Sequence, residues 1–203
     1  MDKSIINNHQ KYLERMSLYK KFGYDIEEER KFIIEKAQSI YGDVMEVGTG
    51  KGYFTLALAR EGCNFTSIDI SQEEQAFAKL NIKYCGFESQ VNFKIADAQK
   101  LPFKDNEFDI VFCVNTFHHF ENPLKITDEL MRVISFEGKI ILSDFNKEGL
   151  MLVDKIHHRE GRSHNTGLFD LDYTARYLLD SGFRLEKSRT DFQEVVVAYH
   201  PII

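Results

Sequence analysis

The stretch from Asp43 to Phe54, DVMEVGTGKGYF, constrains the possible folds more than any other part of the chain. A short apolar strand runs into three glycines that alternate at positions 48, 50 and 52, and a helical pattern follows them. Glycines in such a turn let the backbone approach a ligand with no Cβ in the way. The helix behind the turn presents free N–H groups and the positive end of its dipole. The stretch therefore predicts a strand–turn–helix unit that binds a ligand.

Downstream of this turn, segments with the pattern of strands alternate with segments with the pattern of helices. Ser71 and Glu74 form a capping box for one helix, and Asn122 precedes Pro123 at the start of another. This alternation predicts an α/β fold with a doubly wound, mostly parallel sheet. The expected strands are 43–47, 64–69, 91–96, 108–114, 138–143, 183–190 and 192–199.

The last two expected strands are joined by a link too short for a crossover helix, so they pair as an antiparallel hairpin. The segment 145–169 before them is rich in His and Gly and is expected to be irregular or partly helical. A helix capped by Asp170 is expected to follow and to end before Gly182.

The first 42 residues carry two helical patterns, and the second begins after Asp25. We interpret both helices as a packed cover; the alternative is a lid that turns Tyr12, Tyr19 or Tyr24 toward a substrate. The length fits one domain, 1–203. It divides into an N-terminal helical cover at 1–42, a ligand-binding core at 43–145, and a substrate-side segment with the C-terminal hairpin at 146–203.

The composition is that of a soluble globular protein with an acidic balance, a net charge of −6. This argues against a nucleic-acid partner, because duplex binding relies on clustered Lys and Arg. No apolar run is long enough to span a bilayer, and the N-terminus lacks the apolar core of a signal peptide. Cys63, Cys85 and Cys113 lack CxxC spacing, so we expect reduced, mostly buried thiols in a cytoplasmic protein. The sequence leaves the oligomeric state open.

Polar groups follow four consecutive strands of the expected parallel sheet. Glu46 precedes the glycine turn, Asp69 ends the second strand, and Asp97 and Asn115 follow the third and fourth. In an open parallel sheet the ligand lies beyond the carboxyl ends of the strands, so we expect these groups to share one pocket. Asp69 lies about 20 residues past the first glycine, where a carboxylate can hold the hydroxyls of a ribose.

Two other nucleotide-binding motifs fit the glycine turn less well. A phosphate-binding P-loop needs Ser or Thr after its lysine, but Lys51 is followed by Gly52. A dinucleotide fingerprint needs the spacing GxGxxG, but this turn reads GxGxG with Tyr53 after it. An acidic residue two positions before the first glycine suits a ligand with an ammonium group better than a pyrophosphate.

Six stretches follow one another in the order and at the spacing of a known family: EVGTGKG at 46–52, SIDI at 67–70, ADAQKLPF at 96–103, FDIV at 108–111, HH at 118–119 and GKIIL at 138–142. On these stretches, residues 43–145 resemble class I S-adenosylmethionine-dependent methyltransferases of the type 11 small-molecule family, similar to the ubiquinone and menaquinone C-methyltransferases. The resemblance implies a Rossmann-like sheet of seven strands in the order 3-2-1-4-5-7-6, with strand 7 antiparallel.

The resemblance also implies a site for S-adenosylmethionine. The glycine turn would pack against the methionine part and the sugar, with Glu46 beneath it, and Asn115 with the next residue would give backbone contacts to the methionine end. Asp69 would bind the ribose hydroxyls and Asp97 the adenine amine, while Ile70 would cover the adenine face and the backbone N–H of the residue after Asp97 would donate to the base. The implied cofactor-binding residues are Glu46, Gly48, Thr49, Gly50, Gly52, Asp69, Ile70, Asp97, Ala98 and Asn115.

Histidines at two places are candidates for the acceptor side of this site. His118, in the pair that follows the fourth strand, is a catalytic candidate, and ordering of the loop is the alternative. On a helix, His157, Glu160 and His164 would share one face at i, i+3 and i+7. They form a solvated charged loop, a substrate-contacting or proton-handling cluster, or a metal site. We predict no bound metal, and Arg159 beside the cluster would suit an anionic substrate.

The sequence therefore favours an enzyme that transfers a methyl group from S-adenosylmethionine to a small-molecule acceptor by in-line displacement, leaving S-adenosyl-L-homocysteine. The alternative is a non-catalytic protein that binds the cofactor or a partner on the same fold. A nicotinamide-dependent dehydrogenase is a distant third, because the position of Tyr53 breaks the dinucleotide spacing. The identity of the acceptor and of the acceptor atom stays open.

Overall fold

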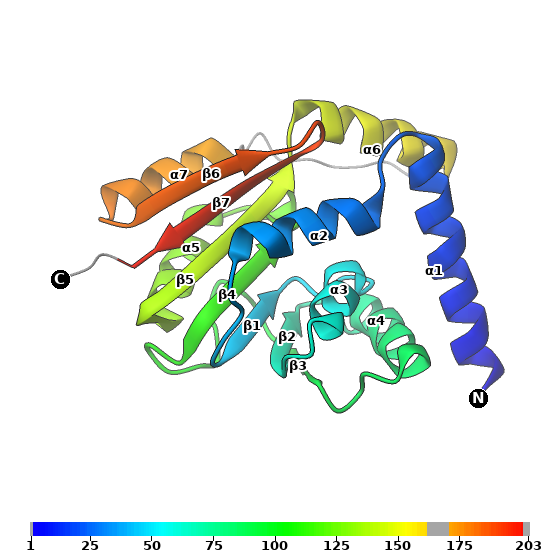
Figure 1. The fold of residues 1–203 in the computed structure, drawn as a ribbon, viewed down its shortest axis with the longest axis horizontal. Coiled ribbons are helices and arrows are strands. Elements are labelled where there is room, and N and C mark those ends of the chain that lie inside the picture. Colours follow the sequence, from blue (N-terminus) through cyan, green and yellow to red (C-terminus); the bar gives the residue numbers. More distant parts are fainter. Residues whose placement is uncertain (1, 162–170, 201–203) are drawn as a thin grey trace.

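The computed structural model describes residues 2–161 and 171–200, and its centre is one seven-stranded sheet (Figure 1). The strand order is β3-β2-β1-β4-β5-β7-β6, which confirms the order that the family resemblance implies. The strands are β1 (Val44–Val47), β2 (Phe65–Asp69), β3 (Val91–Ile95), β4 (Phe108–Val114), β5 (Ile134–Phe145), β6 (Arg184–Arg189) and β7 (Gln193–Tyr199).

The first five strands run parallel, and β7 pairs antiparallel with both β5 and β6. The register places Glu46 of β1 opposite Ser67 of β2 and Phe112 of β4. The carboxyl ends of β1, β2, β3 and β4 therefore meet at one edge of the sheet, as expected for a ligand site of this fold. The C-terminal hairpin is confirmed as well.

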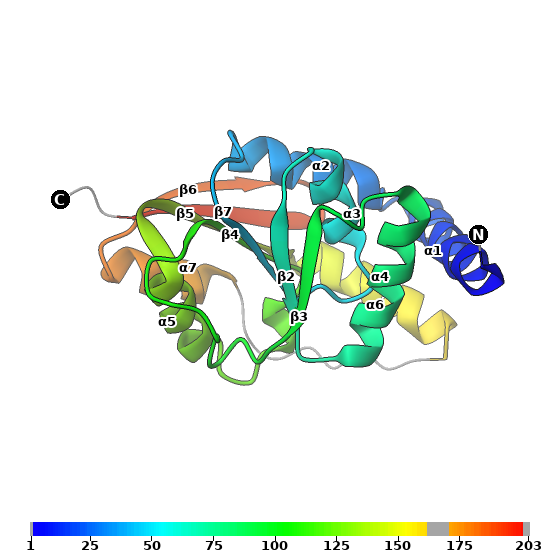
Figure 2. The same ribbon diagram turned by 90° about the horizontal axis from the view of Figure 1, so that it is seen from below.

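The helices are α1 (Lys3–Lys21), α2 (Ile26–Ala37), α3 (Tyr53–Arg60), α4 (Gln72–Cys85), α5 (Pro123–Val133), α6 (Lys147–Arg159) and α7 (Leu171–Asp180), with a 3₁₀ turn η1 (Phe117–His119) after β4. They cover both faces of the sheet, and Figure 2 shows α5 and α7 on one side with α2 on the other. Side chains of β1 alternate accordingly: Met45 and Val47 pack in the cluster with α5 and α7, whereas Val44 packs in the cluster with α2, α3 and α4.

Local capping explains where several helices begin. The side chain of Asp25 accepts from the N–H groups of Glu27 and Glu28 at the start of α2, and Ser71 accepts from Glu74 N–H at the start of α4. The proposed cap of α7, Asp170, lies outside the described residues.

The segment after β5 is more regular than expected, because α6 is a helix of 13 residues. The side chain of Asn146 accepts from Gly149 N–H at 2.9 Å and caps it. Gly149 weakens a helix locally, but a Cβ there would lie 2.2 Å from the carbonyl oxygen of Phe192. A tertiary contact thus explains this glycine. The helix ends at Arg159, before Gly161, whose φ is +69°.

The N-terminal cover packs beside the sheet, with α1 against α4 and α2 against α3 and β7. Tyr24 is 1% exposed and donates to Gln193 Oε1 at 2.8 Å, so it belongs to the interior and does not face a ligand. The boundaries of the three-part division of the chain stay a prediction. No helix of the described residues has the length and apolarity needed to cross a membrane. All three cysteines are free thiols, but only Cys113 is buried and the other two are half-buried.

Candidate functional site

The glycine turn is held against the end of β2 and is tightly packed at two of its glycines. The N–H groups of Gly48 and Thr49 both donate to the carbonyl oxygen of Ile68, at 2.9 and 3.0 Å. Gly48 and Gly52 have φ of +88° and +83°, a region that L side chains rarely adopt. A Cβ would lie 2.2 Å from Thr116 Oγ1 at Gly48, and 2.9 Å from the Cα of the α4 residue Ala78 at Gly52.

Gly50 differs from its two neighbours, because a Cβ there would meet no described atom within 4 Å. Its N–H donates to Asp69 Oδ2 at 2.6 Å, while Asp69 Oδ1 accepts from Ser71 N–H at 2.8 Å. The carboxylate thus joins the turn to the end of β2. Each of its oxygens accepts one N–H and keeps a further lone pair for a ligand hydroxyl.

The ends of β1, β2 and β3 enclose a cavity of about 270 Å³, which we call the strand-end cavity. Asp97, at its far side, has one oxygen that accepts from Gln99 N–H at 2.8 Å. Ile70 is 71% exposed, although it is a large apolar side chain. Five predicted cofactor residues line this cavity: Gly48, Asp69, Ile70, Asp97 and Ala98.

Glu46 lies beneath the turn and is 1% exposed. Its Oε2 accepts from Thr55 Oγ1 at 2.8 Å and from Ser67 Oγ at 2.5 Å, and Ser67 Oγ lies 2.6 Å from Thr49 Oγ1. Burial raises the pKa of Glu46 to about 8 despite these two donors. Its Oε1 has no hydrogen-bonding partner among the described residues. The site therefore holds a buried acceptor below the turn, while the Thr49 side chain is buried and serves the network rather than the cavity.

Asn115 follows β4 with φ of +51°, an uncommon conformation for a residue other than glycine. Its N–H donates to the carbonyl oxygen of Ser143 at 2.8 Å, and its Oδ1 accepts from Gln193 Nε2. Contacts from β5 and β7 therefore hold Asn115 in this left-handed conformation at the carboxyl end of β4. The sequence did not point to Gln193, because β7, the last strand along the chain, carries no recognised motif.

His118 is 5% exposed, and it is the next residue, His119, that lines the strand-end cavity. The Nδ1 of His118 lies 2.6 Å from Asp144 Oδ1, and its backbone N–H donates to Asp144 Oδ2 at 2.9 Å. The pair orders the turn after β4. Sequence reasoning missed Asp144, although the rule that polar groups gather at strand ends could have found it at the end of β5.

His157 and Glu160 meet at the end of α6 through a residue of α1. Arg15 Nη1 donates to both carboxylate oxygens of Glu160, at 3.1 and 3.2 Å, and its Nη2 lies 3.1 Å from His157 Nε2. His164, the third member of the proposed cluster, lies outside the described residues. Among the described residues, no three side chains converge in a way that could hold a metal ion.

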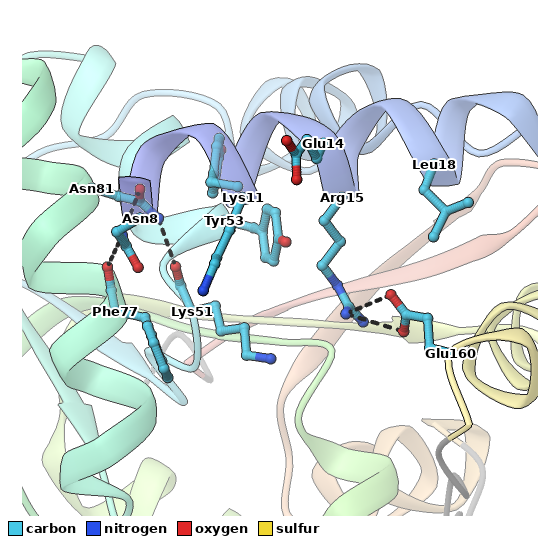
Figure 3. A pocket seen from close by; sticks show the side chains of 11 residues that line it. Asn8, Lys11, Glu14, Arg15, Leu18, Lys51, Tyr53, Phe77, Asn81 and Glu160 are labelled. Atoms are coloured by element: carbon cyan, nitrogen blue, oxygen red, sulfur yellow. Dashed lines mark hydrogen bonds and ion pairs between the residues drawn. The ribbon is translucent and has the colours of Figure 1, made fainter. Parts of the chain in front are cut away.

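A second cavity, of about 390 Å³, lies below α1 and beside the residues that follow the glycine turn (Figure 3). We call it the α1 cavity. Lys11, Tyr12 and Arg15 of α1 line it, with Lys51 and Tyr53 from the turn and α3. It shares no lining residue with the strand-end cavity.

Residues 45–142 match the model of a methyltransferase domain family, type 11. This is the segment that contains the glycine turn and the strand ends described above. Residues 45–142 belong to this methyltransferase family.

Curated relatives agree with this assignment of the methyltransferase domain. The uncharacterised methyltransferase YcgJ of Bacillus subtilis is 30% identical over 116 residues, which cover 57% of this chain and 46% of the relative. A ubiquinone biosynthesis O-methyltransferase of Dechloromonas aromatica is 30% identical over 116 residues, or 56% and 49% of the two chains. The chain thus spans about half the length of these relatives.

The fold of the methyltransferase domain is also that of solved structures. The crystal structure of YcgJ matches with a TM-score of 0.69 at 18% identity, over 86% of this chain and 98% of that one. S-adenosylmethionine is the cofactor of this family. The groups present fit it, because the strand-end cavity offers the carboxylates of Asp69 and Asp97 to hydroxyl and amine donors and an exposed Ile70 to a planar base. Glu46 Oε1, buried beneath the turn without a partner among the described residues, is a further acceptor next to this cavity wall.

Proposed function

We propose that this protein transfers the methyl group of S-adenosylmethionine to a small-molecule acceptor by in-line displacement and releases S-adenosyl-L-homocysteine. One observation supports this most: Asp69, Asp97 and Ala98, which come from the ends of two neighbouring strands, line a single cavity together with the first glycine of the turn. A nucleoside with a free ribose offers hydroxyl and amine donors that match these acceptors.

The residues of the chain then perform binding, orientation and exclusion of water. Asp69 binds the ribose hydroxyls while its hydrogen bond to Gly50 N–H keeps the turn in place, and Asp97 binds the adenine amine. When bound, the cofactor supplies a methyl group that its sulfonium has already activated. Alignment of the acceptor with that methyl group contributes several kcal/mol, on the order of 7 or more for a well-oriented pair.

His118, His157 and His164 stay predictions for the acceptor side. The burial of His118 against Asp144 favours its role in ordering the turn after β4. A carbon or oxygen acceptor usually needs a base, whereas a nitrogen or sulfur acceptor does not. We further propose a cytoplasmic protein whose partner is the small-molecule acceptor, with no nucleic acid and no membrane involved.

Replacement of Asp69 tests the cofactor site directly. Asp69→Ala removes charge-assisted hydrogen bonds to the ribose and should weaken binding of S-adenosylhomocysteine by about 1 kcal/mol or more. Isothermal titration measures this, with Asp180→Ala, an exposed carboxylate on α7, as the matched control. An unchanged dissociation constant for Asp69→Ala would reject the ribose assignment.

Binding alone does not separate an enzyme from a non-catalytic binder on the same fold. Production of S-adenosylhomocysteine in the presence of a panel of acceptors does so. Persistent absence of turnover over a broad panel, together with intact cofactor binding, would contradict methyl transfer and support the non-catalytic alternative.

A further inference from the structure

The α1 cavity has walls of aromatic rings. Tyr12 and Tyr53 stack with their ring centroids 4.8 Å apart and their planes 21° from parallel. Phe77 of α4 adds a third ring to the lining. Such walls favour a ligand with a flat apolar body, because aromatic pairs prefer offset-stacked or edge-to-face contacts.

The phenols in this wall stay neutral at ordinary pH. Burial raises the pKa of Tyr12 to about 12 and also raises the pKa of Tyr53. Neither ring therefore places a negative charge against a ligand that is itself an anion.

The charged groups of the lining have a positive excess. Lys11, Arg15 and Lys51 stand against two carboxylates, Glu14 and Glu160, which gives a formal charge of +1. Figure 3 shows Lys11 and Arg15 extending from α1 toward the space that Lys51 also enters from the opposite wall. Glu160 engages Arg15 through both carboxylate oxygens. Lys51 Nζ also lies 3.9 Å from Glu74 Oε2 of α4, a carboxylate outside the lining, and an anion between the two lysines would be attracted by both.

This cavity and the strand-end cavity border the same glycine turn. Gly48, at the beginning of the turn, lines the strand-end cavity, while Lys51 and Tyr53, at its end, line the α1 cavity. A methyltransferase needs two neighbouring binding sites, one for the methyl donor and one for the acceptor. The carboxylates proposed for the nucleoside, Asp69 and Asp97, line the strand-end cavity, and the α1 cavity is the one at the other end of the same turn.

We propose that the α1 cavity binds the methyl acceptor and selects an aromatic compound that carries a carboxylate. The rings of Tyr12, Tyr53 and Phe77 hold the flat body, and Lys11 and Lys51 hold the carboxylate. The cavity volume of about 390 Å³ is within the usual range for small-molecule sites, roughly 300–1,000 Å³. This inference rests on the proposed methyl transfer.

The test uses the full chain saturated with S-adenosylhomocysteine, so that no reaction occurs. The probes are 4-hydroxybenzoate and 3,4-dihydroxybenzoate, each compared with its uncharged primary amide by titration followed by calorimetry or NMR. We expect each carboxylate to bind at least fivefold tighter than its amide. Lys11→Gln should reduce that ratio at least threefold, while Lys21→Gln, an exposed lysine on the same helix, should leave it unchanged.

Several results would overturn the assignment of the acceptor. Equal affinity for acid and amide, no binding of either carboxylate, or a ratio that Lys11→Gln leaves intact would each do so. A loss of S-adenosylhomocysteine affinity in Lys11→Gln would mean that the lysine serves the carboxylate of the cofactor instead. Binding of S-adenosylhomocysteine to the unmodified chain is measured first. Its absence would defeat the proposed function, whereas its presence without acid selectivity would defeat only this inference.

Discussion

The strand-end cavity and the α1 cavity border the same glycine turn but are built in different ways. The first is formed by backbone and carboxylates at the ends of adjacent parallel strands, where the sheet itself sets the spacing. The second is formed by side chains from separate helices, and its Arg15–Glu160 contact joins residues 145 positions apart. The difference teaches that the cofactor side is fixed by local chemistry and the sheet, while the acceptor side depends on how α1 and α6 pack.

The largest effect should come from the packed glycine at the end of the turn. Gly52→Ala forces a Cβ to within 2.9 Å of the Ala78 backbone at a φ of +83°, so we expect a loss of about 3 kcal/mol in the free energy of unfolding. Gly50→Ala, with open space around its Cβ, should cost about 1 kcal/mol for its left-handed backbone. Urea unfolding of both variants measures the difference, and equal losses would show that packing does not govern the turn.

The buried carboxylate below the turn should make stability depend on pH. The pKa of Glu46 is raised to about 8 in the folded protein, so the protonated form stabilises the fold fully below the unfolded pKa near 4.5. That stability is lost as the pH rises toward 8. Glu46→Gln keeps the shape of the side chain and removes its titration. The free energy of unfolding of this variant, relative to that of the unmodified chain, should therefore rise by about 2 kcal/mol from pH 5 to pH 8.

Urea unfolding of both chains at the two pH values provides the measurement. A difference between the chains that does not change with pH would mean that Glu46 titrates normally. Repeating the comparison with S-adenosylhomocysteine sharpens it, because an ammonium group near Glu46 should favour the ionised carboxylate and reduce the pH dependence.

The smallest effect should come from the contact that closes the α1 cavity. Arg15 and Glu160 have side chains that are 18% and 23% exposed, so a double-mutant cycle to Ala should give a coupling of about 1 kcal/mol. The matched pair is Arg60 with Glu27, whose side chains are 49% and 57% exposed; its coupling should stay under about 0.5 kcal/mol. Equal coupling energies in the two cycles would remove the distinction between this contact and a surface ion pair.

Much of the cofactor side could be predicted from sequence because its signals are local. Strand patterns placed β1 to β4 within one or two residues, and capping residues such as Ser71 placed the helix starts. The position of β5 was correct but its length was not, since the strand continues from Ile134 directly after α5. The pairing of β5 with β4 shifts register between Phe108 and Ile110, and no sequence pattern predicts such an irregularity.

The sequence by itself determined the positions of the strands, the glycine turn and the row of polar groups at the strand ends, whereas the strand order came from the resemblance to a known family. These depend on side-chain periodicity and on turns that only glycine accommodates. Only the tertiary structure decided that His118 is buried against Asp144, that Gly149 lies against Phe192, and that Arg15 reaches Glu160. The physical reason is that burial and long-range contacts follow from how whole elements pack, and a pattern within one element does not contain the element that will cover it.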